Sequence, residues 1–366
     1  MSTKSKEKDV RDKLKELAIG TVKDINTHKN PFLDIPLRSL SNVHFNEIKS
    51  IIELGSEKQK RYFFNVGQAK KFMQTFLVAA SCNELLNVGK TTSIRDLYYM
   101  TKHTIPGSNE ETFNDQIESD PIIEDLEVTI DALREELNLF ASNRGAMVGN
   151  ITIEDSGDSI DLRRLGSGGW SAPSIVEENI IKFKNCEAKF ILLVEKDAVW
   201  RRVNEDKFWK KHNCVLIHGQ GMPPRGVRRL LRRMVSELKI PLYVMVDQDP
   251  WGLYIYSVIK QGSINLAYES VRMAIPEAKF IGLSSFDQDK YKLPSNVTIK
   301  LNELDKKRAK QMLDYPWFKK KDWQKEINHM LQKGVKLELE ALSAKGISFV
   351  TETYLPDKIN NKLWFD

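Results

Sequence analysis

The chain has 366 residues, a length that predicts two or three domains. Hydrophobic residues make up 41% and charged residues 29%, which is typical of a globular and not a disordered protein. The first residues are charged, no apolar run approaches the roughly 20 residues that cross a bilayer, and the three cysteines lie far apart. These features argue against a membrane span, a signal peptide and a disulfide framework, so we expect a soluble cytoplasmic protein.

The net charge of +6 is unevenly distributed along the chain. Residues 110–136 hold eleven acids and one base, whereas residues 196–239 hold twelve bases and four acids. A basic block of that size often faces a polyanion such as nucleic acid. A solvated helix face has a similar composition, so charge alone leaves both interpretations open.

The first part of the chain has mainly helical periodicity. Apolar residues recur there at helical spacing, and Ser93 is a suitable cap for a short helix that Pro106 and Gly107 end. The helices predicted in this part are 1–24, 68–88, 94–103 and 122–141.

A change of pattern follows these helices. Residues 147–166 alternate like two short strands joined by a Gly/Asp turn. Helices followed by a small hairpin are typical of a winged helix-turn-helix, whose short helix enters a DNA groove. Residues 166–171 (GSGGWS) resemble a hinge. We therefore predict three parts, namely a helical segment over 1–69, a winged-helix DNA-binding domain over 70–165 and a different domain over 166–366.

Buried-type strands alternate with helices after the hinge. This pattern predicts an α/β domain with a mainly parallel sheet, in which functional groups lie at the carboxyl ends of the strands. The predicted strands are 190–195, 213–218, 241–247 and 278–284, and the clearest helices are 225–238 and 252–262.

Three carboxylates stand at those strand ends. Glu195 closes one strand, and Asp247 and Asp249 close another, two residues apart and therefore on one side. Glu195 can join them if its strand neighbours theirs. Carboxylate oxygens with open positions suit Mg²⁺, which also takes phosphate oxygens. The alternative is a set of helix caps and surface ion pairs, which we consider the weaker interpretation for three acids in this arrangement.

Several motifs now resemble one family. LLVEKDAVW and the later VMVDQDPWG resemble the Toprim domain of topoisomerases and primases, whose signature is a strand-end glutamate and a DxD pair. SIRDLYYMTKHT resembles the catalytic-tyrosine segment of topoisomerase VI A subunits and of the related meiotic double-strand-break transesterase. GMPPRGVRRLLRRM and DQDPWGLYIYSVIKQGS also resemble archaeal A subunits. The likeness runs from about residue 70 to the end of the chain, with the motifs in the family's order.

Two adjacent tyrosines compete for the role of nucleophile. On a helix their side chains diverge by about 100°, so only one reaches a given phosphate. Arg95 precedes Tyr99 by one turn and can stabilise phenolate and phosphate charge, whereas Ile94 precedes Tyr98, which we expect to pack inward. The family also places its nucleophile at the second aromatic residue. We therefore predict Tyr99 as nucleophile and Arg95 as its assistant.

The resemblance implies the DNA-cleaving chain of a type IIB topoisomerase, its A subunit. Such a chain has a CAP-like winged-helix tyrosine domain followed by a Toprim domain, and its magnesium-dependent transesterification leaves a 5′-phosphotyrosyl double-strand break. It works as a homodimer in which the tyrosine of one protomer acts with the Toprim site of the other. The implied ATP is bound by a separate B subunit, not by this chain, in a heterotetramer with two copies of each. That heterotetramer relaxes supercoils and decatenates DNA, which implies association with the nucleoid, and residues 1–69 are the expected docking segment for the B subunit.

An arginine stripe completes the predicted site. Five arginines recur at helical spacing in the predicted helix 225–238, and no acid lies between residues 225 and 236 to pair with them. We therefore predict that the stripe contacts the DNA backbone, which fixes position and not sequence preference. A solvated helix is the alternative. The arginines are Arg225, Arg228, Arg229, Arg232 and Arg233.

Two other functions remain open at this point. A transesterase that makes breaks without resealing them would use the same residues, so the sequence cannot separate it from a topoisomerase. A non-catalytic DNA-binding scaffold would use the basic residues alone, but it would leave Tyr99 and the three acids without a role.

Overall fold

The computed structural model describes residues 3–366, which divide into two compact units. Unit 1 comprises the chain up to His44 together with Leu54–Ser142, and unit 2 comprises Phe45–Glu53 and Asn143–Asp366. Each unit is described by itself. Within residues 3–366, none of the helices is long and apolar enough to cross a membrane.

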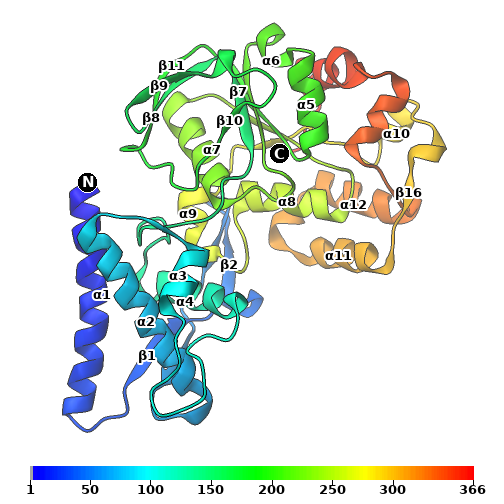
Figure 1. The fold of residues 1–366 in the computed structure, drawn as a ribbon. Coiled ribbons are helices and arrows are strands. Elements are labelled where there is room, and N and C mark those ends of the chain that lie inside the picture. The colour runs from blue at the N-terminus through cyan, green and yellow to red at the C-terminus, as the bar shows by residue number, and fades with distance from the viewer. Residues whose placement is uncertain (1–2) are drawn as a thin grey trace. The chain divides into compact units, whose positions relative to one another are not determined.

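The α-helices follow the chain in the order below, and Figure 1 labels all of them except α13. They are α1 (Thr3–Asn26), α2 (Val66–Val88), α3 (Ile94–Thr101), α4 (Ser119–Ile130), α5 (Asp197–Glu205), α6 (Phe208–Lys211), α7 (Arg225–Leu238), α8 (Pro250–Gln261), α9 (Ser270–Met273), α10 (Asp287–Lys290), α11 (Glu303–Asp314), α12 (Lys321–Lys333) and α13 (Leu355–Asn360).

The strands are short, as expected for a mixed fold. They are β1 (Phe32–Pro36), β2 (Val43–Asn46), β3 (Ile51–Leu54), β4 (Lys58–Tyr62), β5 (Thr92–Ser93), β6 (Leu139–Phe140), β7 (Ala146–Gly149), β8 (Ile151–Asp155), β9 (Asp158–Asp161), β10 (Trp170–Ser171), β11 (Ile181–Cys186), β12 (Phe190–Val194), β13 (Cys214–His218), β14 (Leu242–Met245), β15 (Lys279–Phe280), β16 (Ile299–Lys300) and β17 (Val335–Lys336).

The helices of unit 1 share one apolar core. Val10 and Leu14 of α1, Cys82 of α2, Leu97 of α3 and Leu126 of α4 are all buried in it. The short helix α3 begins at Ile94 and is capped as predicted by Ser93, whose hydroxyl accepts a hydrogen bond from the Asp96 N–H at 3.0 Å. The cap and the buried Leu97 together fix the orientation of the helix that carries the two tyrosines.

A six-stranded mixed sheet forms the centre of unit 2, with strand order β10-β7-β13-β12-β14-β15. The strands β13, β12, β14 and β15 run parallel, whereas β7 and β10 add antiparallel pairs at one edge. The central strand β12 (FILLV) is buried along its whole length, which explains its continuous apolar run. The predicted α/β domain with a mainly parallel sheet is confirmed.

The boundary between the units differs from the predicted one at residue 166. The long segment of unit 2 already begins at Asn143, because β7 pairs with β13 and β8 pairs with β11. The predicted hairpin is present as β8 and β9, joined at Ser156 and Gly157, but it lies in a three-stranded sheet with β11 and belongs to unit 2. The GSGGWS segment leads into β10 instead of separating two domains.

Two other parts of the first half differ from the predicted helices. The helix predicted over 122–141 stops at Ile130, because Asp131 adopts a left-handed conformation (φ +47°). Residues 32–62, which carry no clear periodicity, form the antiparallel pair β1–β4 and the two-stranded sheet β2–β3.

Candidate functional site

The tyrosine segment lies on α3 in unit 1. Tyr98 is 7% exposed and packs against Phe113, whereas Tyr99 is 59% exposed. The prediction that Tyr98 packs inward is therefore confirmed. Its hydroxyl accepts a hydrogen bond from the ammonium of Lys102 at 3.0 Å, so this phenol is already engaged within the unit.

Tyr99 has the accessibility that a nucleophile requires. Its ring lies edge-on to that of Tyr98, with centroids 5.1 Å apart. Arg95 lies one turn earlier on the helix and is also exposed, so both side chains are available to a polyanion. The arrangement allows attack on a phosphate by Tyr99 with a guanidinium one helical turn away.

The three predicted metal ligands lie at the carboxyl edge of the central sheet in unit 2. Strands β12 and β14 are neighbours, and the Glu195 N–H donates to the Met245 carbonyl at 2.9 Å. The Glu195 carboxylate accepts a hydrogen bond from the Asp247 N–H at 3.0 Å. The condition for Glu195 to join the aspartates, that its strand neighbours theirs, is therefore met.

Burial raises the free-energy cost of keeping these three carboxylates charged. Burial and the charge of Asp247 raise the pKa of Glu195 to about 7. Burial raises the pKa of Asp247 to about 6, although the Leu339 N–H and Lys196 favour its charged form. Burial also raises the pKa of Asp249. A cation bound here would relieve an electrostatic cost that the fold itself creates.

Each aspartate is nevertheless occupied by groups of the chain. Asp249 caps α8, since its carboxylate accepts from the Gly252 N–H at 2.6 Å. Asp247 accepts from the Leu339 N–H at 2.7 Å and contacts the ammonium of Lys196 at 3.0 Å. Within residues 3–366, no three histidine, cysteine or acidic side chains are gathered as around a metal ion. Carboxylate oxygens are the donors that Mg²⁺ prefers, and those of the two aspartates are engaged here by backbone N–H groups and by Lys196.

The structure brings three further charged residues to this edge that the sequence interpretation missed. The ammonium of Lys196 also contacts Glu338 at 3.1 Å and Glu340 at 2.9 Å. The sequence does carry a signal for the two glutamates, because leucine and glutamate alternate in the segment KLELE. The structure buries both leucines of that segment. Nothing in that alternation indicates which strand end the segment meets.

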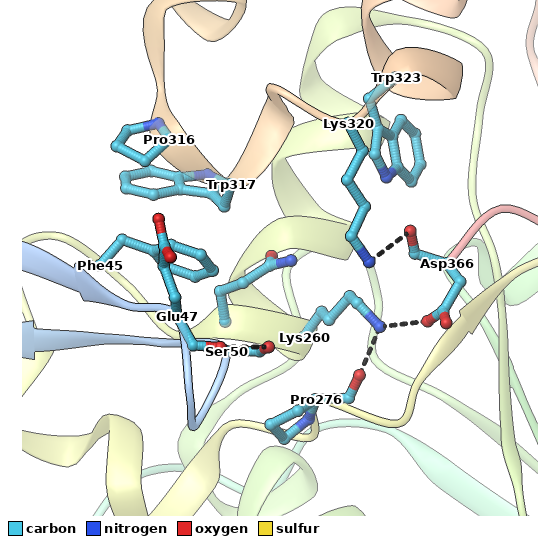
Figure 2. Close-up of a pocket in the computed structure, with 11 residues that line it drawn as sticks. Phe45, Glu47, Ser50, Lys260, Pro276, Pro316, Trp317, Lys320, Trp323 and Asp366 are labelled. Carbon is cyan, nitrogen blue, oxygen red and sulfur yellow. Dashed lines mark hydrogen bonds and ion pairs between the residues drawn. The ribbon is translucent and has the colours of Figure 1, made fainter.

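A cavity of about 330 Å³ in unit 2 includes none of the predicted site residues in its lining. Figure 2 shows its two lysines turned toward the last residue of the chain. Lys260 donates to the Asp366 carboxylate at 2.9 Å, and Lys320 donates to the Asp366 carbonyl at 3.2 Å. The cations of this cavity are thus paired with groups of the chain itself.

Comparison with known proteins decides the family. The Toprim-domain model shared by Spo11 and the topoisomerase 6 A subunit matches residues 190–359, the type IIB DNA topoisomerase model matches 70–139, and the model of an all-beta domain in the DNA topoisomerase VI alpha subunit matches 143–187. The chain is 44% identical to the A subunit of type 2 DNA topoisomerase 6 from Pyrococcus abyssi, over 96% of this chain and 94% of the relative. It is 42% identical to the A subunit from Hyperthermus butylicus (97% and 95% covered) and 34% identical to the DNA topoisomerase 6 A subunit from Arabidopsis thaliana (90% and 75% covered).

The chain belongs to the family of topoisomerase VI A subunits. Tyr99 and Arg95 fall within the type IIB topoisomerase match, and Glu195, Asp247 and Asp249 fall within the Toprim match. The predicted Toprim domain is confirmed. The all-beta match begins at residue 143, as the long segment of unit 2 does, and agrees with the observed position of β8, β9 and β11.

The arginine stripe of this topoisomerase VI family member is not the exposed ridge that we predicted. Arg225 and Arg228 are buried and both pair with Glu269, the first at 2.9 Å and the second at 3.7 Å. The partner acid lies outside the helix, so a search for acids within 225–236 could not find it.

The other three arginines are also paired. Arg229 makes a two-pronged contact with Glu177 at 2.9 and 3.0 Å, and the buried Arg233 pairs with Glu237. Arg232 is the most exposed of the five, at 30%, and its nearest acid, Glu277, is 3.6 Å away. The stripe therefore attaches α7 to its neighbours, and only Arg229 and Arg232, with side chains 23% and 30% exposed, stay partly exposed among the five.

Proposed function

We propose that this chain is the DNA-cleaving subunit of a type IIB topoisomerase and that Tyr99 is its nucleophile. The observation that carries the proposal is the presence, in one chain and in the family's order, of an exposed tyrosine and of carboxylates on adjacent parallel strand ends. A scaffold that only binds DNA has no use for either feature.

The chemistry follows from the residues. The Tyr99 hydroxyl oxygen attacks the phosphorus of a backbone phosphodiester and loses its proton as the new ester forms. The bond from phosphorus to the 3′ oxygen breaks, and that oxygen leaves as a hydroxyl after taking up a proton. Arg95 stabilises the charge on the phosphate during this exchange. The energy of the broken bond is kept in the 5′-phosphotyrosine ester, so the reverse reaction reseals the strand.

Glu195 and Asp247, with Asp249, are the residues that we propose to hold Mg²⁺. A bound Mg²⁺ ion would neutralise the non-bridging phosphate oxygens and the leaving 3′ oxygen. Support comes from the donor set and from the raised pKa values of the buried carboxylates, which favour the arrival of a cation. Asp249 also has a structural role, because its carboxylate caps α8.

Two copies of the chain are required to cut both strands of a duplex. We propose that Tyr99 of one protomer works with the acids of its partner, as family resemblance implies. We propose that a CAP-like winged-helix unit carries the tyrosine segment, supported by the packed helices of unit 1 and the match to the type IIB topoisomerase model; the hairpin β8–β9, which lies in unit 2, is not part of that unit. Because the proposed substrate is duplex DNA, we propose that the assembly associates with the nucleoid.

Strand passage requires an ATPase, which we assign to a separate B subunit in an A₂B₂ heterotetramer that relaxes and decatenates DNA. The second half of α1 supports its role as docking segment, since Ile19, Val22 and Ile25 are each at least half exposed. Replacing Ile19 and Val22 with aspartate should abolish co-purification with the B subunit while unit 1 stays folded. Retained co-purification would place the docking surface elsewhere.

The test is a trapping experiment with the full chain, its B-type partner, supercoiled DNA and magnesium. Rapid denaturation should leave protein attached to 5′ ends, and chelation of magnesium before mixing should prevent it. Relaxation of the unbroken plasmid with ATP then separates a topoisomerase from an enzyme that cuts without resealing. DNA binding without any covalent adduct would overturn the proposal.

A further inference from the structure

Lys196 directly follows the predicted ligand Glu195 and turns back over the same strand ends. Its ammonium lies 3.0 Å from Asp247, 3.1 Å from Glu338 and 2.9 Å from Glu340. The side chain is 24% exposed, so most of it is covered by the surrounding segments. A single cation thus joins a predicted metal ligand to two acids that are not predicted ligands.

The Lys196 ammonium contacts a carboxylate oxygen of Asp247 that a metal ion would need as a ligand. One carboxylate oxygen of Asp247 accepts the Leu339 N–H at 2.7 Å, and the other faces Lys196. Asp247 is 5% exposed, so water contributes little to its solvation. Without a divalent ion, Lys196 is therefore the cation that balances this buried carboxylate.

The other two partners of Lys196 can hold its ammonium when it is not on Asp247. Glu338 and Glu340 are 51% and 45% exposed, and both can keep a flexible ammonium at the rim after it leaves Asp247. Both acids stand next to Leu339, whose N–H holds the other oxygen of Asp247. The carboxylate therefore stays anchored while its cation changes.

We infer that Lys196 is an exchangeable internal cation, which occupies Asp247 before a divalent ion binds and moves onto Glu338 and Glu340 when the ion arrives. The inference rests on the proposed function, in which Asp247 is a metal ligand. Lys196 is then a positioning residue that sets the concentration of divalent ion at which the site loads. A divalent ion that binds Asp247 must first displace the Lys196 ammonium, which weakens its binding. Removing the lysine removes this competition.

The experiment measures metal binding and not cleavage. The full-length chain without DNA is titrated with Mn²⁺, and free Mn²⁺ is counted by electron paramagnetic resonance. Lys196→Met should bind Mn²⁺ roughly five- to tenfold more tightly than the natural chain, because a competing charge is gone. Lys196→Arg keeps the charge and should stay within about twofold of the natural chain. Lys182→Met, which removes a lysine paired with Glu154, is the matched control and should change nothing.

The possible results separate this inference from the proposed function. Unchanged or weaker binding in a folded Lys196→Met chain overturns the inference, since a lysine that only tethers the segment would give one of these. If the natural chain binds no Mn²⁺, or if Asp247→Asn leaves binding intact, the proposed metal site itself fails.

If Lys196→Met does not fold, a second variant tests whether Lys196 competes with the metal ion for Asp247. Glu340→Gln takes away one of the lysine's other partners and leaves the ammonium on Asp247. Binding of Mn²⁺ should weaken about threefold, with little change in thermal stability because Glu340 is half exposed. Unchanged binding would show that Lys196 does not compete for Asp247.

Discussion

Glu195 and Asp247 are adjacent acids in an environment that disfavours their charged forms. One accepts a hydrogen bond from the backbone N–H of the other, and burial raises the pKa of both. A natural protein keeps such a pair where a cation is to be bound or a proton moved. Their position at strand ends could be predicted from the sequence, because continuous apolar strands that end in acids leave little choice.

Removal of either carboxylate should separate cleavage from DNA binding. Glu195→Ala and Asp247→Ala should each lower cleavage at least about a hundredfold, because ligands of one ion are not independent. DNA affinity, measured by fluorescence anisotropy, should change less than about threefold. Asp249→Ala should also destabilise α8, by roughly 1 kcal/mol for the lost cap. Normal cleavage by Glu195→Ala at millimolar magnesium would remove Glu195 from the site.

The same carboxylates predict how stability depends on pH without a divalent ion. In the folded chain the pKa of Glu195 is about 7 and that of Asp247 about 6, both above their ordinary values. The folded state therefore holds protons that the unfolded chain has released, and the free energy of unfolding falls as the pH rises toward 7, by about 1.4 kcal/mol per pH unit for each extra proton.

Thermal melts in a chelator at pH 5 and pH 7.5 measure this loss. The variant Glu195→Gln/Asp247→Asn has no such protons to lose, so its melting temperature should decline less over the same interval. An equal decline in both chains would show that other groups account for the effect.

The contact of Lys196 with Glu338 and Glu340 could not be predicted from the sequence. The distance along the chain between Lys196 and Glu340 is 144 residues, and no local pattern links them. Their meeting depends on the isolated pairing of Gln248 with Leu337, which carries the C-terminal segment across the strand ends. Contacts of that kind depend on tertiary packing and not on periodicity.

The helices illustrate which elements a sequence can specify. The observed α7 (Arg225–Leu238) has the predicted bounds, because apolar residues recur at helical spacing and Pro224 precedes it. The end of α4 could not be placed, since Asp131 takes a left-handed conformation that favours glycine or asparagine and is not indicated by the acidic run around it. The pairs β1–β4 and β2–β3 were missed because strands such as β4 (KQKRY) are largely exposed and polar.

The arginines of α7 could be placed on the helix but not given partners. Arg225→Ala should lower the free energy of unfolding by roughly 1–3 kcal/mol, because the buried Glu269 would lose a contact at 2.9 Å and keep the longer contact to Arg228. Arg232→Ala, on the same helix, is the control and should cost less than about 0.5 kcal/mol. Chemical denaturation measures both. A stable Arg225→Ala chain with weakened DNA binding would restore the exposed ridge that we first expected.

At the scale of the whole molecule, the two chemical motifs lie in different compact units. Unit 1 carries Tyr99 and Arg95, and unit 2 carries the three carboxylates with Lys196. The order of the motifs could be predicted from the sequence, whereas the boundary at Asn143 could not, because β7 enters the sheet of unit 2 by pairing with a strand far along the chain. The separation of the two motifs agrees with the proposed reaction, in which Tyr99 of one protomer works with the carboxylates of its partner.

The measurement that tests the account most directly compares Tyr99→Phe with Tyr98→Phe in the trapping experiment with magnesium and the B-type partner. Each variant loses one hydroxyl, so fold and DNA affinity should survive in both. The 5′ adduct should disappear in Tyr99→Phe, whose ring is exposed, and persist in Tyr98→Phe, whose hydroxyl already accepts a hydrogen bond from Lys102. An adduct that persists in Tyr99→Phe and disappears in Tyr98→Phe would contradict the assignment of the nucleophile and, with it, the role of Arg95.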